Sequence, residues 1–209
     1  MIEHIVCGQK FGFDNNKYLI AFWKSIQAGW NPFENIKMTK ELYDIVKEHK
    51  EEYHPEIVAL VGFCSTYNAK WFGGYAGTIK TKDGKFRNYY DEAVRNVLKQ
   101  ASHVQDVIFE CADYREIKTE GSLIYCDPPY IGKTGYCDYF DHSQFWDWCR
   151  KMSEKNIVLC SEYIAPKDFM CIWQKELTTT LDKNSRSQSV EKLFCLNERG
   201  KNDEIRRFC

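Results

Sequence analysis

The stretch that most restricts how this chain can fold is Leu-Ile-Tyr-Cys-Asp-Pro-Pro-Tyr, residues 123–130. Its apolar, β-branched and aromatic beginning predicts a buried strand. Pro128 and Pro129 cannot donate hydrogen bonds to a neighbouring strand, so the strand must end near Asp127. The Asp127 carboxylate and the Tyr130 ring are therefore expected at the carboxyl end of a strand, where open α/β sheets bind ligands.

The composition is that of a folded protein. The chain has 209 residues, 44% of them hydrophobic and 15% aromatic, which is enough to bury a sizeable core. Its formal net charge is −1, so contact with nucleic acid would require a local basic patch. None of the 10 cysteines shows zinc-ligand spacing, which predicts reduced core thiols and no metal site. Neither a signal peptide nor a membrane-spanning stretch is evident, which predicts a cytoplasmic protein without a membrane partner.

Predicted strands and helices alternate along the chain. A first strand ends at Asp14, and a helix follows it, with Asp14 or Asn15 as N-cap and Gly29 at its end. Later strands are predicted in DVIFECADY, SLIYCDPPY and NIVLCSEY, with helices at about 40–53, 89–101 and 142–155. This alternation predicts an α/β fold with a mainly parallel sheet. The last two strands, FMCIWQKELTT and VEKLFCLN, predict a C-terminal antiparallel hairpin.

Residues 127–130 suit the capture of an aromatic amine. Such an amine is a poor nucleophile because its lone pair is delocalised into the ring. Accepting hydrogen bonds from both amino hydrogens favours a pyramidal nitrogen, and the Asp127 carboxylate and the Pro128 carbonyl, held rigid by Pro129, can do this. Tyr130 offers a stacking face for a base turned out of the duplex. The alternative is a plain strand-ending turn, in which Asp-Pro is common.

The motif DPPY after an apolar strand resembles motif IV of amino-methyltransferases that use S-adenosylmethionine, and the chain is similar to Dam-like DNA adenine methyltransferases of phages and bacteria. FGFDNNKYLIAFWKSIQAGW resembles the acidic motif of this branch, FECADYREI the strand and turn beside the cofactor's adenine, and VLCSEYIAPKDFMCIW and SVEKLFCLN the late strands. The resemblance implies a Rossmann-like class I methyltransferase sheet. It also implies cofactor contacts by Asp14, Asp113, Tyr114 and Asp127, and methyl transfer to adenine in double-stranded DNA.

The beginning of the chain departs from this pattern. The family has a first strand and a glycine-rich cofactor loop before the acidic motif, but only MIEHIVCGQKFGF precedes Asp14. We therefore expect the first strand and the N-terminal cofactor motif to be missing. The chain is a fragment, or a second polypeptide or another copy supplies the missing part, or the cofactor is not bound.

Residues 57–101 are expected to form a DNA target-recognition insert between two parts of the catalytic core, 1–56 and 102–200, with 201–209 as a tail. Basic side chains in the insert can neutralise phosphates and aromatic ones can stack on bases. The alternative is an ordinary β-hairpin with a solvated face, since KTKDGKF is a good turn. The candidate DNA-binding residues are Tyr67, Lys70, Trp71, Tyr75, Lys80, Lys82, Lys85 and Arg87.

The leading hypothesis is therefore a site-specific DNA methyltransferase acting by direct in-line transfer to the amino nitrogen of adenine. Two alternatives stay open. One is an amino-methyltransferase acting on cytosine or on a glutamine side chain. The other is an inactive DNA-binding fragment, or one subunit of a split methyltransferase.

Overall fold

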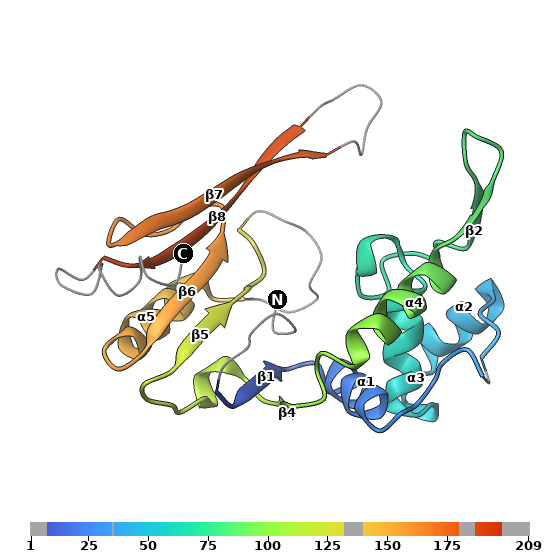
Figure 1. Ribbon diagram of the computed structural model, residues 1–209, viewed down its shortest axis with the longest axis horizontal. Coiled ribbons are helices and arrows are strands. Elements are labelled where there is room, and N and C mark those ends of the chain that lie inside the picture. Colours follow the sequence, from blue (N-terminus) through green and yellow to red (C-terminus); the bar gives the residue numbers. More distant parts are fainter. Residues whose placement is uncertain (1–7, 35, 132–139, 180–186, 198–209) are drawn as a thin grey trace. The chain divides into compact units, whose positions relative to one another are not determined.

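The computed structural model describes residues 8–34, 36–131, 140–179 and 187–197. The chain folds into two compact units, Met1–Ile117 and Lys118–Cys209 (Figure 1). The expected tail at 201–209 lies outside the described residues. No helix within the described ranges is long and apolar enough to cross a membrane.

The first unit contains a two-stranded parallel sheet. Strand β1 (Lys10–Asp14) pairs with β4 (Val107–Cys111), and Asp14 lies opposite Cys111. Ile20, Val104, Val107 and Phe109 form a buried cluster that includes one face of β4. The predicted strand end at Asp14 is confirmed.

Helix α1 (Lys17–Gln27) follows β1 directly. Its N-cap is Asn16, whose side chain accepts the backbone N–H groups of Tyr18 and Leu19, and not Asp14 or Asn15 as expected. The Asp14 carboxylate instead accepts the N–H of Asn16 at 2.7 Å, which turns the chain one residue further before the helix begins. Gly29 follows the C-cap with a φ of 88°, as a helix-ending glycine should.

Three more helices complete the core of this unit: α2 (Lys40–Glu48), α3 (Pro55–Ala59) and α4 (Tyr89–Ala101). Helix α2 is shorter than expected, because the chain changes into a 3-10 turn at Lys50–Glu52. The predicted bounds of α4 are confirmed. One buried cluster joins α1, α3 and α4, and includes Phe22, Ile26, Ala59, Leu60, Tyr90 and Val94.

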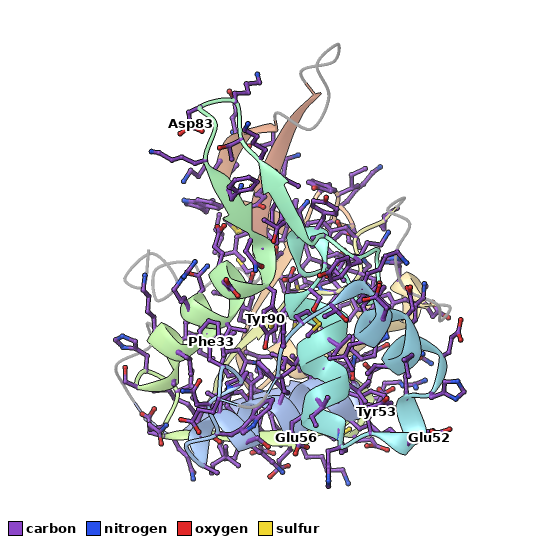
Figure 2. All side chains as sticks on the ribbon, turned by 90° about the vertical axis from the view of Figure 1, so that its right-hand side faces the viewer. Phe33, Glu52, Tyr53, Glu56, Asp83 and Tyr90 are labelled. Carbon is purple, nitrogen blue, oxygen red and sulfur yellow. The ribbon has the colours of Figure 1, made fainter. Side chains whose placement is uncertain are left out.

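A π-helical turn, Leu60–Cys64, continues α3 and is almost wholly buried. Gly62 lies in this turn against the ring of Trp71, so that a Cβ atom there would come within 2.5 Å of the ring. The chain then enters a small antiparallel hairpin, β2 (Thr78–Lys80) and β3 (Phe86–Asn88). The hairpin is exposed, and Figure 2 shows Asp83 at its far end.

The second unit is a four-stranded sheet in the order β5-β6-β8-β7, with helix α5 (His142–Ser153) packed against it (Figure 1). Strands β5 (Leu123–Cys126) and β6 (Ile157–Glu162) are parallel. Strands β7 (Phe169–Thr179) and β8 (Ser187–Leu196) form the predicted antiparallel hairpin. The expected α/β class is confirmed.

The parallel strands pair within each of the two units. In the described residues β1 pairs only with β4, and β5 pairs only with β6, so the parallel strands belong to two separate sheets. Strand β5 is therefore an edge strand and is not fully buried as predicted: Leu123 is 50% and Tyr125 37% exposed. The physical reason is that a strand at the edge of its sheet has one neighbouring strand instead of two.

Candidate functional site

The loop Asp127–Tyr130 begins where β5 ends, at Cys126, as the two prolines require. Pro128 is buried and anchors the loop, while Pro129 and Tyr130 are half-buried. Asp127 is an exposed residue overall, but protein atoms crowd its carboxylate, and this desolvation raises its pKa. Hydrogen bonds with the Tyr130 and Ser161 hydroxyls partly oppose the rise.

The end of the neighbouring strand β6 holds this loop in place. Because Cys126 lies opposite Cys160, the next residue, Ser161, stands beside Asp127. The hydroxyls of Tyr130 and Ser161 are hydrogen-bonded to each other. The backbone N–H of Ile131 donates to a carboxylate oxygen of Glu162 at 2.7 Å. The loop is thus fixed at two consecutive residues by side chains of β6.

Glu162 is the most unusual of these residues, because it is acidic and only 1% exposed. Its second carboxylate oxygen accepts the backbone N–H of Tyr163. The Tyr163 ring meets the Tyr130 ring edge to face, with 4.8 Å between centroids. Ser161, Glu162 and Tyr163 were not among the predicted site residues. In the sequence these three consecutive residues stand at the carboxyl end of the strand that pairs in parallel with β5, which is a position where α/β sheets bind ligands.

A second group of acidic residues lies at the carboxyl end of the parallel pair in the first unit. Asp14 ends β1, and Asp113 follows β4 by two residues. Burial raises the pKa of Asp14, while the N–H of Asn16 lowers it to a smaller extent. Asp113 is paired with Arg115, which donates from Nε at 2.8 Å and from Nη2 at 2.6 Å and lowers the pKa of this carboxyl. Tyr114 is half-buried beside them.

The β2–β3 hairpin carries most of the predicted DNA-binding cations. Its charged side chains are one acid, Asp83, and four exposed cations, Lys80, Lys82, Lys85 and Arg87. Arg87 is paired with Glu92 at 2.6 Å, and Lys85 lies 3.4 Å from Asp83. Within the described residues Lys80 and Lys82 have no ion-pair partner.

The predicted aromatic residues are not equally accessible. Trp71 is half-buried and packs between Phe63 and Phe72, and Tyr75 packs against Tyr43. Tyr67 is 47% exposed, although its hydroxyl is bonded to the Ala76 carbonyl. Lys70 is exposed.

Phe86, which was not among the predicted DNA-binding residues, is more exposed than any of the predicted aromatic residues. Phe86 lies in β3 between Lys85 and Arg87 and is 77% exposed. The signal in the sequence was an aromatic residue flanked by two cations on a predicted hairpin.

Comparison with protein families identifies the enzyme family of this chain. The model of the D12 class N6 adenine-specific DNA methyltransferases matches residues 8–162, which is most of the chain and includes both acidic strand ends and the Asp127–Tyr130 loop. The chain belongs to this family. It is therefore a DNA adenine methyltransferase, and the expected enzyme class is confirmed. A search of curated proteins found no match.

Proposed function

We propose that this methyltransferase transfers a methyl group from S-adenosylmethionine to the amino nitrogen of adenine in double-stranded DNA by direct in-line transfer. The observation that carries the proposal is the Asp127–Tyr130 loop, which stands at a strand's carboxyl end and is held there by Ser161 and Glu162. A loop anchored in this way can keep hydrogen-bond acceptors in one position, as capture of an amine requires.

The residues at the carboxyl ends of β1 and β4 fit a ribose and an adenine. One oxygen of Asp14 accepts the Asn16 N–H, so the other oxygen can accept a ribose hydroxyl. Tyr114, half-buried next to Asp113, offers a ring face to an adenine. In this proposal Asp14, Asp113 and Tyr114 hold the nucleoside part of the methyl donor.

S-Adenosylmethionine supplies an electrophilic methyl group on its sulfonium. The chain's own residues prepare the acceptor. The ionised Asp127 carboxylate and the Pro128 carbonyl accept the two amino hydrogens of adenine, which localises the nitrogen lone pair. The nitrogen then forms a bond to the methyl carbon while the carbon–sulfur bond breaks. The nitrogen finally loses one proton, for which Asp127 is the nearest acceptor in this scheme, and its raised pKa favours that step.

We further propose that the β2–β3 hairpin contacts the DNA. Four cations on a short exposed hairpin can neutralise phosphates, and the protruding Phe86 ring can wedge against a base step. Because Trp71 and Tyr75 are engaged in packing, their role is to support the segment from which the hairpin projects. Tyr67 and Lys70 lie on its exposed side.

A test of the hairpin is the joint replacement of Lys80, Lys82, Lys85 and Arg87 by glutamine. The salt dependence of DNA binding should become shallower by roughly one logarithmic unit for each phosphate contact that is lost. The measurement is DNA affinity by fluorescence anisotropy over a range of salt concentrations. The matched control replaces four exposed lysines of the same unit outside the hairpin, Lys24, Lys37, Lys40 and Lys47. If both sets of replacements leave the same salt slope, the hairpin is a solvated surface and not a DNA contact.

Both units have exposed apolar side chains, which are a reason to expect contact with a further protein. Phe11, Phe13 and Ile108 are 44%, 38% and 38% exposed on the β1–β4 pair. On β5, Leu123 and Tyr125 are exposed as well. Apolar side chains of neighbouring strands favour contact with further protein. We propose that another polypeptide, from a second copy or a partner chain, covers apolar strand surfaces of this chain.

The proposed function is tested by incubating the chain with S-adenosylmethionine labelled in its methyl group and a duplex that contains adenine and cytosine. After digestion to nucleosides, the label should appear in N6-methyladenine. If a second copy completes the enzyme, the activity per chain should rise with chain concentration. Label in methylcytosine or in protein would support another amine acceptor. No transfer at any chain concentration would refute the assignment of activity to this chain by itself or with its copies.

A further inference from the structure

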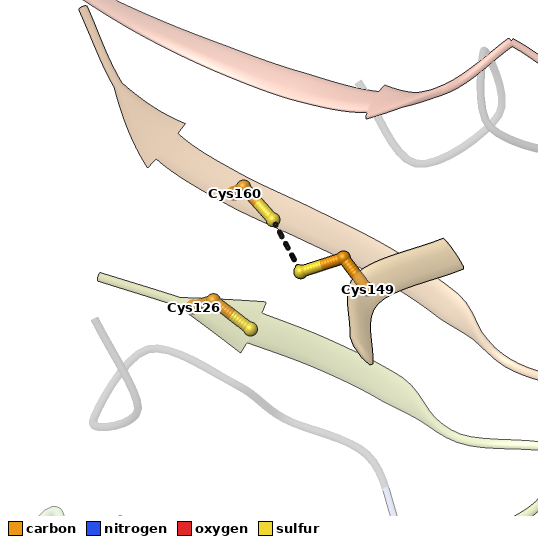
Figure 3. A group of neighbouring side chains, drawn as sticks. All are labelled: Cys126, Cys149 and Cys160. Atoms are coloured by element: carbon orange, nitrogen blue, oxygen red, sulfur yellow. Dashed lines mark hydrogen bonds between the residues drawn. The ribbon is translucent and has the colours of Figure 1, made fainter. Parts of the chain in front are cut away.

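We propose that Cys126, Cys149 and Cys160 form a binding site for one thiophilic metal cation of the Zn²⁺ or Cu⁺ class. The three thiols come from β5, α5 and β6, and are separated along the chain by intervals that match no zinc motif. Figure 3 shows the three side chains near one another, with the sulfur atoms of Cys149 and Cys160 pointing toward each other. The inference does not depend on the methyl-transfer chemistry.

The distances between the thiols suit a single ion. All three sulfur atoms lie within 4.8 Å of one another, and the Sγ atoms of Cys149 and Cys160 are 3.5 Å apart. A metal about 2.3 Å from each of three sulfurs in a plane would hold them about 4 Å apart. The sulfurs therefore need to move by only a fraction of an ångström to share one ion.

The surroundings favour a soft cation. Cys149 and Cys160 have no exposed surface, and Cys126 is half-buried. Thiolates in a dry setting select Zn²⁺ or Cu⁺ over Mg²⁺ or Ca²⁺, which require oxygen ligands. Since Cys126 is the most accessible of the three, an ion would enter from its side.

Binding at this site would tie together the elements that carry the Asp127 loop. Cys126 is the last residue of β5 and directly precedes Asp127, and Cys160 precedes Ser161 on β6. Because the three ligands lie on three elements, a bound ion would cross-link them as a structural metal does. We therefore expect the ion to raise the thermal stability of the chain.

The test is a titration of the metal-free full chain, kept reduced with a phosphine, with Cd²⁺ as a spectroscopic probe for Zn²⁺. The expected result is ultraviolet sulfur-to-metal charge-transfer absorption that saturates at one equivalent, together with a higher melting temperature. Competition by Zn²⁺ and by Cu⁺ should remove the cadmium signal. Absence of this absorption would overturn the proposal and leave a cluster of hydrogen-bonded core thiols.

Substitutions assign the ion to these three thiols. Cys126→Ala should weaken binding by roughly 100-fold, because one of only three ligands is lost. Cys149→Ala and Cys160→Ala should weaken binding to a similar extent, provided that circular dichroism shows the variants to be folded. If these two variants do not fold, the Cys126→Ala variant alone provides the test, because Cys126 is only half-buried. The matched control is Cys171→Ala on β7, an exposed thiol, which should bind like the unmodified chain. Unchanged binding in Cys126→Ala would place the ion elsewhere and refute the site.

Discussion

Methyl transfer should fall by about 10²-fold or more when Asp127 is replaced by alanine, because the amine loses a preorganised acceptor. The measurement is the single-turnover rate of label transfer to adenine. Asp147→Ala is the matched control: this aspartate is also in the second unit, but its side chain is 71% exposed and its ion pair with Arg150 lies at the surface. It should change the rate little. A near-normal rate in Asp127→Ala would remove this residue from the mechanism.

The raised pKa of Asp127 adds a pH dependence with a definite sign. The carboxylate accepts amino hydrogens best when ionised, so the rate should rise with pH through its pKa, which lies above the ordinary aspartate value. The contribution of Asp127 to folding stability has the opposite dependence on pH. A carboxyl whose pKa is raised in the folded state favours folding at low pH, and this contribution is lost as pH rises through the folded-state pKa.

Asp127→Asn separates these two effects. The substitution removes the ionised carboxylate without changing its size. It should slow transfer at pH values above the pKa of Asp127 and remove the rise of the rate with pH. It should also make the chain no less stable at neutral pH, where the crowded carboxylate disfavours folding. Loss of both activity and stability would show that Asp127 serves the fold and not the reaction.

The second large effect is expected for Glu162→Ala. The substitution leaves the N–H groups of Ile131 and Tyr163 without their acceptor in a place that is 1% exposed. Leaving a buried donor without its acceptor costs about 1–3 kcal/mol, so we expect the loss of both acceptors to lower the free energy of unfolding by at least about 2 kcal/mol. Chemical denaturation measures this loss, and the transfer rate should fall as well because the Asp127 loop is no longer anchored.

Glu162→Gln tests whether Glu162 acts by positioning. Glutamine keeps one acceptor oxygen, so it should restore most of the rate if that oxygen holds Ile131. Glu154→Ala is the control for loss of an acid at an exposed place in the same unit. If Glu162→Ala destabilises the chain but a folded sample transfers methyl groups at the normal rate, Glu162 is a structural residue only.

Much of the local structure could be predicted from the sequence, because it depends on neighbouring residues. Pro128 and Pro129 stop β5, and Gly29 follows the end of α1, both as expected. The N-cap of α1 was misplaced because three capping residues, Asp14, Asn15 and Asn16, follow one another. Only hydrogen-bond geometry distinguishes them.

The residue order is sufficient to predict the chemical groups at the strand ends: an acid followed by prolines and a tyrosine, and further acids after two other strands. The hydrogen-bond partners and the packing neighbours of these groups follow only from the tertiary structure. Strand pairing brings Ser161 and Glu162 to the Asp127 loop, the register of β5 and β6 with α5 gathers three distant thiols, and packing turns Trp71 inward while Phe86 remains exposed. The reason is physical. Turns and caps are governed by bonds within a few residues, whereas burial and side-chain partners depend on which strands lie side by side.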